Sequence, residues 1–166
     1  MQGDNLYEEK IPSKQWITGI LTVFTAGFLF VLVYQILVGP IGTRPASNWF
    51  FLLMFLLFLG VTINFSRLSI KITHLSVRVS YGIFRHIIPW ENVKDCYLDE
   101  ASTISYGGWG IRIGRVKGRW ILVYNVIGAP RVVLSLKKGK FKEFVFSTEK
   151  PEEVMNIIKQ RRGSDS

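Results

Sequence analysis

The chain has 166 residues, a formal net charge of +9 and one cysteine. That length allows about one folded domain beside any membrane segment, and a lone cysteine excludes both an internal disulfide and a thiolate metal site. The charge is uneven, because residues 1–66 hold three basic and three acidic residues while residues 67–166 hold 18 Lys or Arg and nine Asp or Glu.

Two apolar segments without any charged residue dominate the first part of the chain. Residues 16–38 and 49–65 comprise 23 and 17 residues. At about 1.5 Å per residue they reach about 35 and 26 Å, against a hydrocarbon core of about 30 Å. A cleaved signal peptide would be shorter and would follow a basic start. We therefore predict a transmembrane helical hairpin over residues 16–66, preceded by a short cytoplasmic tail at residues 1–15.

The charges beside these segments predict the orientation. Arg67, Lys71 and Arg78 follow the second segment, whereas the intervening loop offers only Arg44. Positively charged flanks stay on the cytoplasmic side of a membrane, so both termini should be cytoplasmic in a cell-membrane protein with two spans. A lone cysteine, Cys96, suits the same reducing compartment.

From residue 67 onward the pattern changes to short segments in which apolar and polar residues alternate. This pattern is typical of an all-β meander. Seven strands are expected, the third bent at Pro89: 68–73, 75–80, 84–98, 109–113, 120–125, 131–136 and 141–146.

The end of the chain predicts one helix. It should begin at Pro151, with acidic residues in its first turn and basic residues in its last, the order that the helix dipole favours. Val154, Ile157 and Ile158 have the spacing of one apolar face, suited to capping an open end of a small barrel. Residues 163–166 should be a disordered tail.

Two stretches carry a resemblance to a known family. The runs ITHLSVRVSYGIFRHIIPWENVKD and RVVLSLKKGKFKEFVFSTEKPEEV resemble the early strands and the last hairpin with its capping helix in bacterial and archaeal membrane-anchored pleckstrin-homology-like (PH-like) domains. The resemblance implies a cytoplasmic PH-like barrel over residues 67–162, behind a membrane hairpin. The basic first-hairpin loop that binds phosphoinositides in eukaryotic relatives has no counterpart at Thr73 and His74.

No motif predicts catalysis, a cofactor or a metal. The glycine-rich run YGGWGIRIG has Ile113 where a dinucleotide-binding loop needs its third glycine. The remaining reactive side chains are interpreted as structural or solvated: His74, His86, Asp95, Cys96, Asp99 and Glu100. We therefore expect a non-enzymatic protein that does not bind nucleic acid; an enzyme acting on lipid is a weaker alternative.

The directions of the predicted strands suggest one surface that could contact the membrane. In a simple meander that leaves the membrane at Arg67, the turns after strands two, four and six return toward the bilayer. These turns hold eight basic residues expected to contact anionic headgroups: Arg85, Arg115, Lys117, Arg119, Lys137, Lys138, Lys140 and Lys142.

The predicted function is therefore a membrane-anchored PH-like docking or scaffold module. Its partners would be the anionic lipid bilayer and a protein that binds in the membrane or at the barrel surface. The alternative is an accessory or assembly subunit of a larger membrane complex, which would pack small residues such as Gly19 and Gly27 against partner helices.

Overall fold

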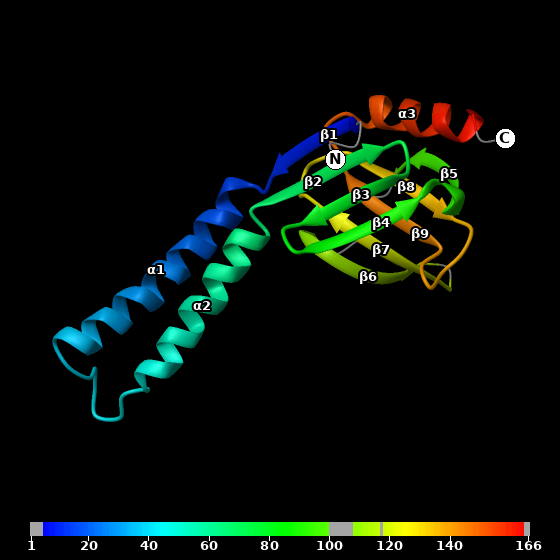
Figure 1. Cartoon of the computed structure of the whole chain (residues 1–166). Helices are drawn as coiled ribbons and strands as arrows, with labels where there is room; N and C mark the ends of the chain where they lie inside the picture. Colours follow the sequence, from blue (N-terminus) through cyan, green and yellow to red (C-terminus); the bar gives the residue numbers. More distant parts are fainter. Residues whose placement is uncertain (1–4, 100–107, 117, 165–166) are drawn as a thin grey trace. The chain divides into compact units, whose positions relative to one another are not determined.

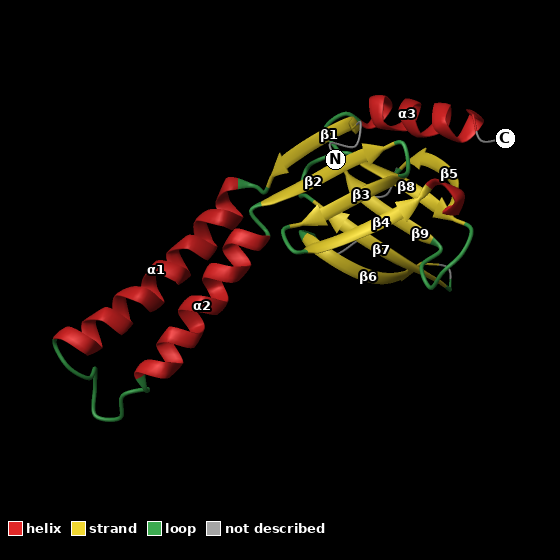
Figure 2. Ribbon diagram, viewed as in Figure 1, coloured by secondary structure: helices red, strands yellow, loops and turns green. Residues whose placement is uncertain are grey.

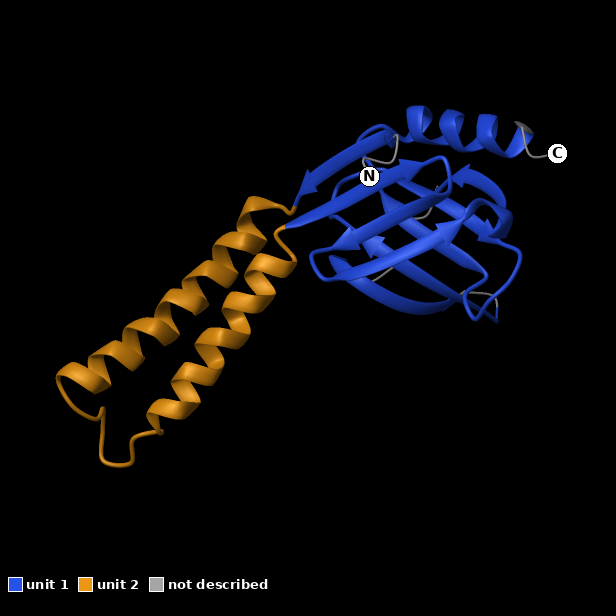
Figure 3. Cartoon of the chain, in the orientation of Figure 1, with its two compact units in different colours: residues 1–12, 67–166 blue, residues 13–66 orange. Residues whose placement is uncertain are grey.

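The computed structural model describes residues 5–99, 108–116 and 118–164, and the chain forms two compact units. Unit 1 combines Met1–Pro12 with Arg67–Ser166, and unit 2 is Ser13–Ser66 (Figure 3). The chain therefore begins in unit 1, passes through unit 2, and returns to unit 1.

Unit 2 is a pair of antiparallel helices, α1 (Gln15–Leu37) and α2 (Asn48–Asn64), joined by a glycine- and proline-containing loop (Figures 1 and 2). Along their seam the hydroxyls of Thr25 and Thr62 lie 3.4 Å apart. The Phe58 ring also packs against α1, with its centroid 5.5 Å from that of Phe24. Away from this seam most of the apolar side chains are exposed.

Only one of these helices has the length and composition to cross a membrane. That helix is α1, whereas α2 is shorter, at 17 residues. No flanking residue extends α2, because the Ser47 hydroxyl caps its start by accepting from the Phe50 N–H at 3.4 Å and Phe65 already lies outside its other end. The prediction of a two-span transmembrane hairpin is therefore wrong.

Unit 1 begins with a four-stranded antiparallel sheet, here called sheet A. Its strands are β1 (Asn5–Pro12), β2 (Arg67–Thr73), β3 (Ser76–Tyr81) and β4 (Phe84–Pro89), and they lie in that order. The alternation seen in the sequence decides which face is buried, since Leu68, Ile70 and Ile72 of β2 are completely buried.

Strand β1 lies in the segment that was expected to be a tail. Tyr7 and Ile11 point into the core, but the residue between them on the same face is Glu9, which hides the alternation in the sequence. The Glu9 carboxylate accepts from the Thr148 hydroxyl at 2.6 Å and from the Glu149 N–H at 2.8 Å. This polar contact joins β1 to the chain segment that precedes the last helix.

The second sheet, sheet B, has five strands. They are β5 (Val93–Leu98), β6 (Gly110–Val116), β7 (Arg119–Asn125), β8 (Arg131–Leu136) and β9 (Glu143–Ser147), in the order β5-β8-β9-β7-β6. The β7–β9 pair is parallel and the other pairs are antiparallel. Long runs of consecutive buried residues in β7, β8 and β9 agree with their central places in the sheet.

The two sheets do not close into a barrel in the described part of the chain, so the predicted seven-stranded PH-like barrel is wrong. The expected bent strand at 84–98 is two strands, β4 and β5, separated by the 3₁₀ turn η1 (Trp90–Asn92). Pro89 cannot donate a ladder hydrogen bond, and the Trp90 indole instead donates to the Thr73 carbonyl at 3.0 Å. Strand β4 therefore ends in sheet A and β5 starts sheet B.

The last helix, α3 (Pro151–Ser164), begins at the predicted proline and contacts β5 and β8. It completely buries Val154 and Ile158, and the Arg162 guanidinium lies 2.6 Å from the Asp95 carboxylate. The helix therefore covers part of sheet B and does not cap a barrel.

Candidate functional site

Six of the eight basic residues that the sequence singled out lie at one end of unit 1, and all six side chains are exposed: Arg115, Arg119, Lys137, Lys138, Lys140 and Lys142. We call them, together with Trp120, the basic cluster. They come from two connections, the β6–β7 hairpin and the β8–β9 loop. Lys117 lies outside the described residues, and Arg85 lies elsewhere, on β4.

Backbone hydrogen bonds hold the two connections together. The Lys142 N–H donates to the Trp120 carbonyl at 2.8 Å. The Lys137 N–H donates to the Asn92 carbonyl at 2.9 Å, and the Lys138 N–H donates to the Asn92 side-chain oxygen at 2.7 Å. Asn92 is thus the residue that fixes the lysine loop against η1, and its role was missed because an asparagine after a proline reads only as a turn signal.

Trp120 is the aromatic residue of the cluster, and two of the cations contact its ring. Its ring is 42% exposed, and it lies 5.8 Å from the Arg115 guanidinium and 5.5 Å from the Lys140 ammonium. Each cation–π contact of this exposed kind contributes about 0.5–1 kcal/mol. The ring therefore contacts one cation from each of the two connections. An anionic ligand would meet a flat apolar surface with positive charge around it.

The cluster lies at the end of unit 1 opposite Arg67. The contact between Trp90 and Thr73 places η1 at the far end of β2, and Asn92 of η1 holds the lysine loop there. Because η1 separates β4 from β5, the chain makes one more reversal than a meander with one bent strand. The β6–β7 hairpin and the β8–β9 loop therefore lie at the opposite end from the one predicted, and of the seven predicted basic residues that the structure describes only Arg85 lies near the Arg67 end. Contact of the eight residues with a membrane stays a prediction.

Of the acidic residues after Lys94, Asp99 is not solvated, contrary to the prediction. Asp99 and Arg131 form a buried ion pair, with the Arg131 Nε 2.7 Å from the Asp99 carboxylate. The side chain of Arg131 is 4% exposed and that of Asp99 is 6% exposed. Asp95 is exposed, and the Cys96 N–H, followed by Arg162, lowers the pKa of its carboxyl. Glu100 lies outside the described residues.

Cys96 and His86 have structural surroundings. Burial raises the pKa of the Cys96 thiol to about 12, which leaves it protonated and unreactive at neutral pH. His86 is half-buried between the sheets, with its ring 5.0 Å from the Phe144 ring, and desolvation lowers its pKa. No group of three His, Cys, Asp or Glu side chains that could hold a metal ion occurs among the described residues.

No family model, curated protein or solved structure matches the chain. The resemblance to membrane-anchored PH-like proteins therefore stays a prediction from the residues alone.

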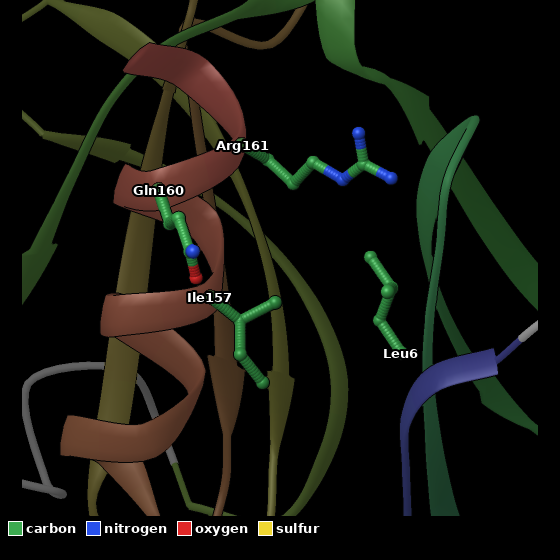
Figure 4. A pocket seen from close by; sticks show the side chains of 4 residues that line it. All are labelled: Leu6, Ile157, Gln160 and Arg161. Carbon is green, nitrogen blue, oxygen red and sulfur yellow. The ribbon is translucent and has the colours of Figure 1, made fainter. Parts of the chain in front are cut away.

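A cleft also opens between β1 and α3. It has a volume of about 360 Å³ and is lined by Leu6, Ile157, Gln160 and Arg161 (Figure 4). In Figure 4 the Arg161 guanidinium extends over the opening from the helix, toward the side on which Leu6 lies. Among the described residues, the two apolar and two polar side chains that line the cleft do not form a set of groups that could perform acid–base or nucleophilic chemistry.

Proposed function

We propose that this protein is a membrane-anchored docking module without enzymatic activity, held in the bilayer by α1 and binding an acidic protein partner through the basic cluster. The exposed apolar surface of unit 2 supports the anchoring. Phe30 and Leu37 of α1 are 68% and 77% exposed, and only Ile17, Thr25 and Leu32 of that helix are buried. Apolar surface on this scale is unfavourable in water and favourable in lipid.

The pairing of β1 with β2 brings the two ends of unit 2 together. Pro12 pairs with Arg67, and next to them in unit 2 the Ser13 N–H donates to the Ser66 carbonyl at 2.9 Å. The chain therefore enters and leaves unit 2 at neighbouring points. If α1 enters the membrane, both termini lie on one side of it, and the basic residues from Arg67 onward support the cytoplasmic side.

The observation that carries the docking proposal is the gathering of six exposed cations at one end of unit 1, two of them over the exposed Trp120 ring. These residues lie at the end of unit 1 opposite the connections to unit 2, so they favour a partner in the aqueous phase over the leaflet that holds the anchor. An acidic protein segment supplies the complementary charge, and charge complementarity of this kind raises the association rate and gives specificity.

The test uses the full-length protein in nanodiscs of neutral lipid with a fluorescent oligoglutamate peptide as the probe. We expect binding that weakens as salt is added. Replacing Arg115, Lys138 and Lys140 with Gln should weaken it roughly 3- to 150-fold, because three exposed ion pairs at about 0.2–1 kcal/mol each sum to about 0.6–3 kcal/mol and 1.4 kcal/mol is a factor of ten.

The matched control replaces three exposed lysines outside the cluster, Lys94, Lys150 and Lys159, and so removes the same net charge. The proposal fails if both triple variants lose affinity equally, which would show attraction by net charge alone. It also fails if the nanodisc-held protein ignores the peptide but captures anionic vesicles through the cluster, since a lipid surface would then be the partner.

A further inference from the structure

The turn between β3 and β4 exposes apolar side chains at a place where polar ones are usual. Tyr81 pairs with Phe84, so Gly82 and Ile83 form a two-residue hairpin turn, with Gly82 at a φ of 49°. Such turns are normally built from Asn, Asp and Gly. Here Ile83 is 81% exposed and the adjacent Phe84 is 48% exposed. The tip of this hairpin is therefore apolar on its outer surface.

The register of sheet A places this turn at the Arg67 end of unit 1. Leu68 pairs with Tyr81, so the next residues of β3 lie level with Arg67 and the turn projects in the direction from which the chain arrives. Only Phe65 and Ser66 separate Arg67 from the last residue of α2, Asn64. At about 3.3–3.6 Å per residue this connection reaches about 10 Å at most. The turn therefore lies at the end of unit 1 to which unit 2 is joined.

Basic side chains accompany the apolar tip. Arg67 at the start of β2 and Arg85 directly after Phe84 are both exposed. An apolar tip with arginines beside it matches the bilayer interface, where the side chains of Ile and Phe enter the acyl boundary and cations meet the headgroups.

A second exposed residue shows that exposure alone does not identify a membrane contact. Leu75, in the turn between β2 and β3, is also 81% exposed, but it lies at the opposite end of sheet A, next to Thr73. The two turns belong to the same sheet and differ in their distance along β2 from the connection to unit 2. The inference therefore depends on position as well as on exposure.

We propose that the β3–β4 turn dips into the bilayer interface that holds α1, with Ile83 and Phe84 in the acyl boundary and Arg67 and Arg85 at the headgroups. This inference rests on the proposed anchoring by α1. The turn would give unit 1 a second point of attachment and so fix its orientation on the membrane, with the basic cluster held away from the bilayer.

The test uses two variants of the full-length protein, Ile83→Cys and Leu75→Cys, each labelled with an environment-sensitive fluorophore and reconstituted into liposomes. Native Cys96 can stay because it is buried and unreactive. We expect the label at position 83 to be quenched by a spin-labelled lipid and shielded from aqueous iodide, with a Stern–Volmer constant several-fold below that of the label at position 75. Equal quenching of the two labels by iodide would overturn the inference.

Alkaline carbonate extraction of the same liposomes separates this inference from the anchoring on which it rests. If the protein is extracted, α1 does not anchor the chain and both proposals fail. If it stays in the membrane while the two labels behave alike, the anchoring holds and only the turn insertion is overturned.

Discussion

His86 is a half-buried side chain that makes the stability of the fold depend on pH. Its ring lies between the two sheets, close to Phe144, and desolvation lowers its pKa below the usual 6.5. The unfolded chain therefore binds more protons than the folded chain between the lowered pKa and about 6.5. Stability is full above about pH 6.5 and falls as the pH drops toward the folded pKa.

We expect His86→Gln to remove this part of the pH dependence. Melting temperatures of the full-length protein in mild detergent, followed by near-UV circular dichroism from neutral pH downward, would show a smaller decline for the variant. His74 is exposed in a turn, so His74→Gln should decline like the unchanged protein. A parallel decline of all three proteins would show that His86 does not contribute.

At the scale of elements, α3 contains two adjacent isoleucines that differ in burial, so the effect of burial on stability can be compared. Ile158 is completely buried, whereas Ile157 is only half-buried beside the cleft near β1. Ile158→Ala should lower the free energy of unfolding by about 2–5 kcal/mol, as do other truncations of buried isoleucine, and Ile157→Ala should cost clearly less.

Denaturant titration of both variants, followed by tryptophan fluorescence, checks this expectation. Ending the chain before Pro151 should have a larger effect, because it removes Val154 as well, and the cooperative transition of unit 1 should be lost. An unchanged transition after that truncation would mean that the helix adds no stability to the sheets.

The sequence predicts helices and strands well where a single periodicity runs uninterrupted. The prediction fails where a contact between residues far apart in the chain determines whether a strand forms or where it ends. Alternation in β2 and β3 and the charge order of α3 were enough to find those elements. Strand β1 was missed because Glu9 occupies a core-facing position and is satisfied by Thr148, far away in the sequence. The number of reversals depended on Trp90, whose indole bonds to Thr73 and turns the chain between sheets.

The candidate site was found only in part for the same reason. Its basic residues are recognisable by type, and their gathering follows from two hairpin-like connections. Their position required the extra reversal at η1, which a local pattern does not reveal. Trp120 was read as a strand residue, because nothing in the neighbouring residues shows that Lys140 lies over its ring.

For the molecule as a whole, the orientation of α1 can be tested directly. On the proposed anchoring, with α1 crossing the membrane from a cytoplasmic start, the residues that follow α1 should lie outside, so Thr43→Cys should react with an impermeant maleimide in intact cells. Cys96 should stay unlabelled because it is buried with a pKa raised to about 12. If position 43 is protected in intact cells and labelled only after the cells are opened, the orientation is the opposite of the one proposed.

The pairing of β1 with β2 also has a consequence for the order of events during synthesis. Strand β1 leaves the ribosome before unit 2, but its partner β2 follows only after all of unit 2, Ser13–Ser66, has been made. At about 5–20 residues per second the nascent β1 stays without its partner for roughly 3–12 s. Its charged residues, among them Glu8 and Lys10, would keep it soluble during that interval. Sheet A can therefore form only after both helices of unit 2 have been synthesised.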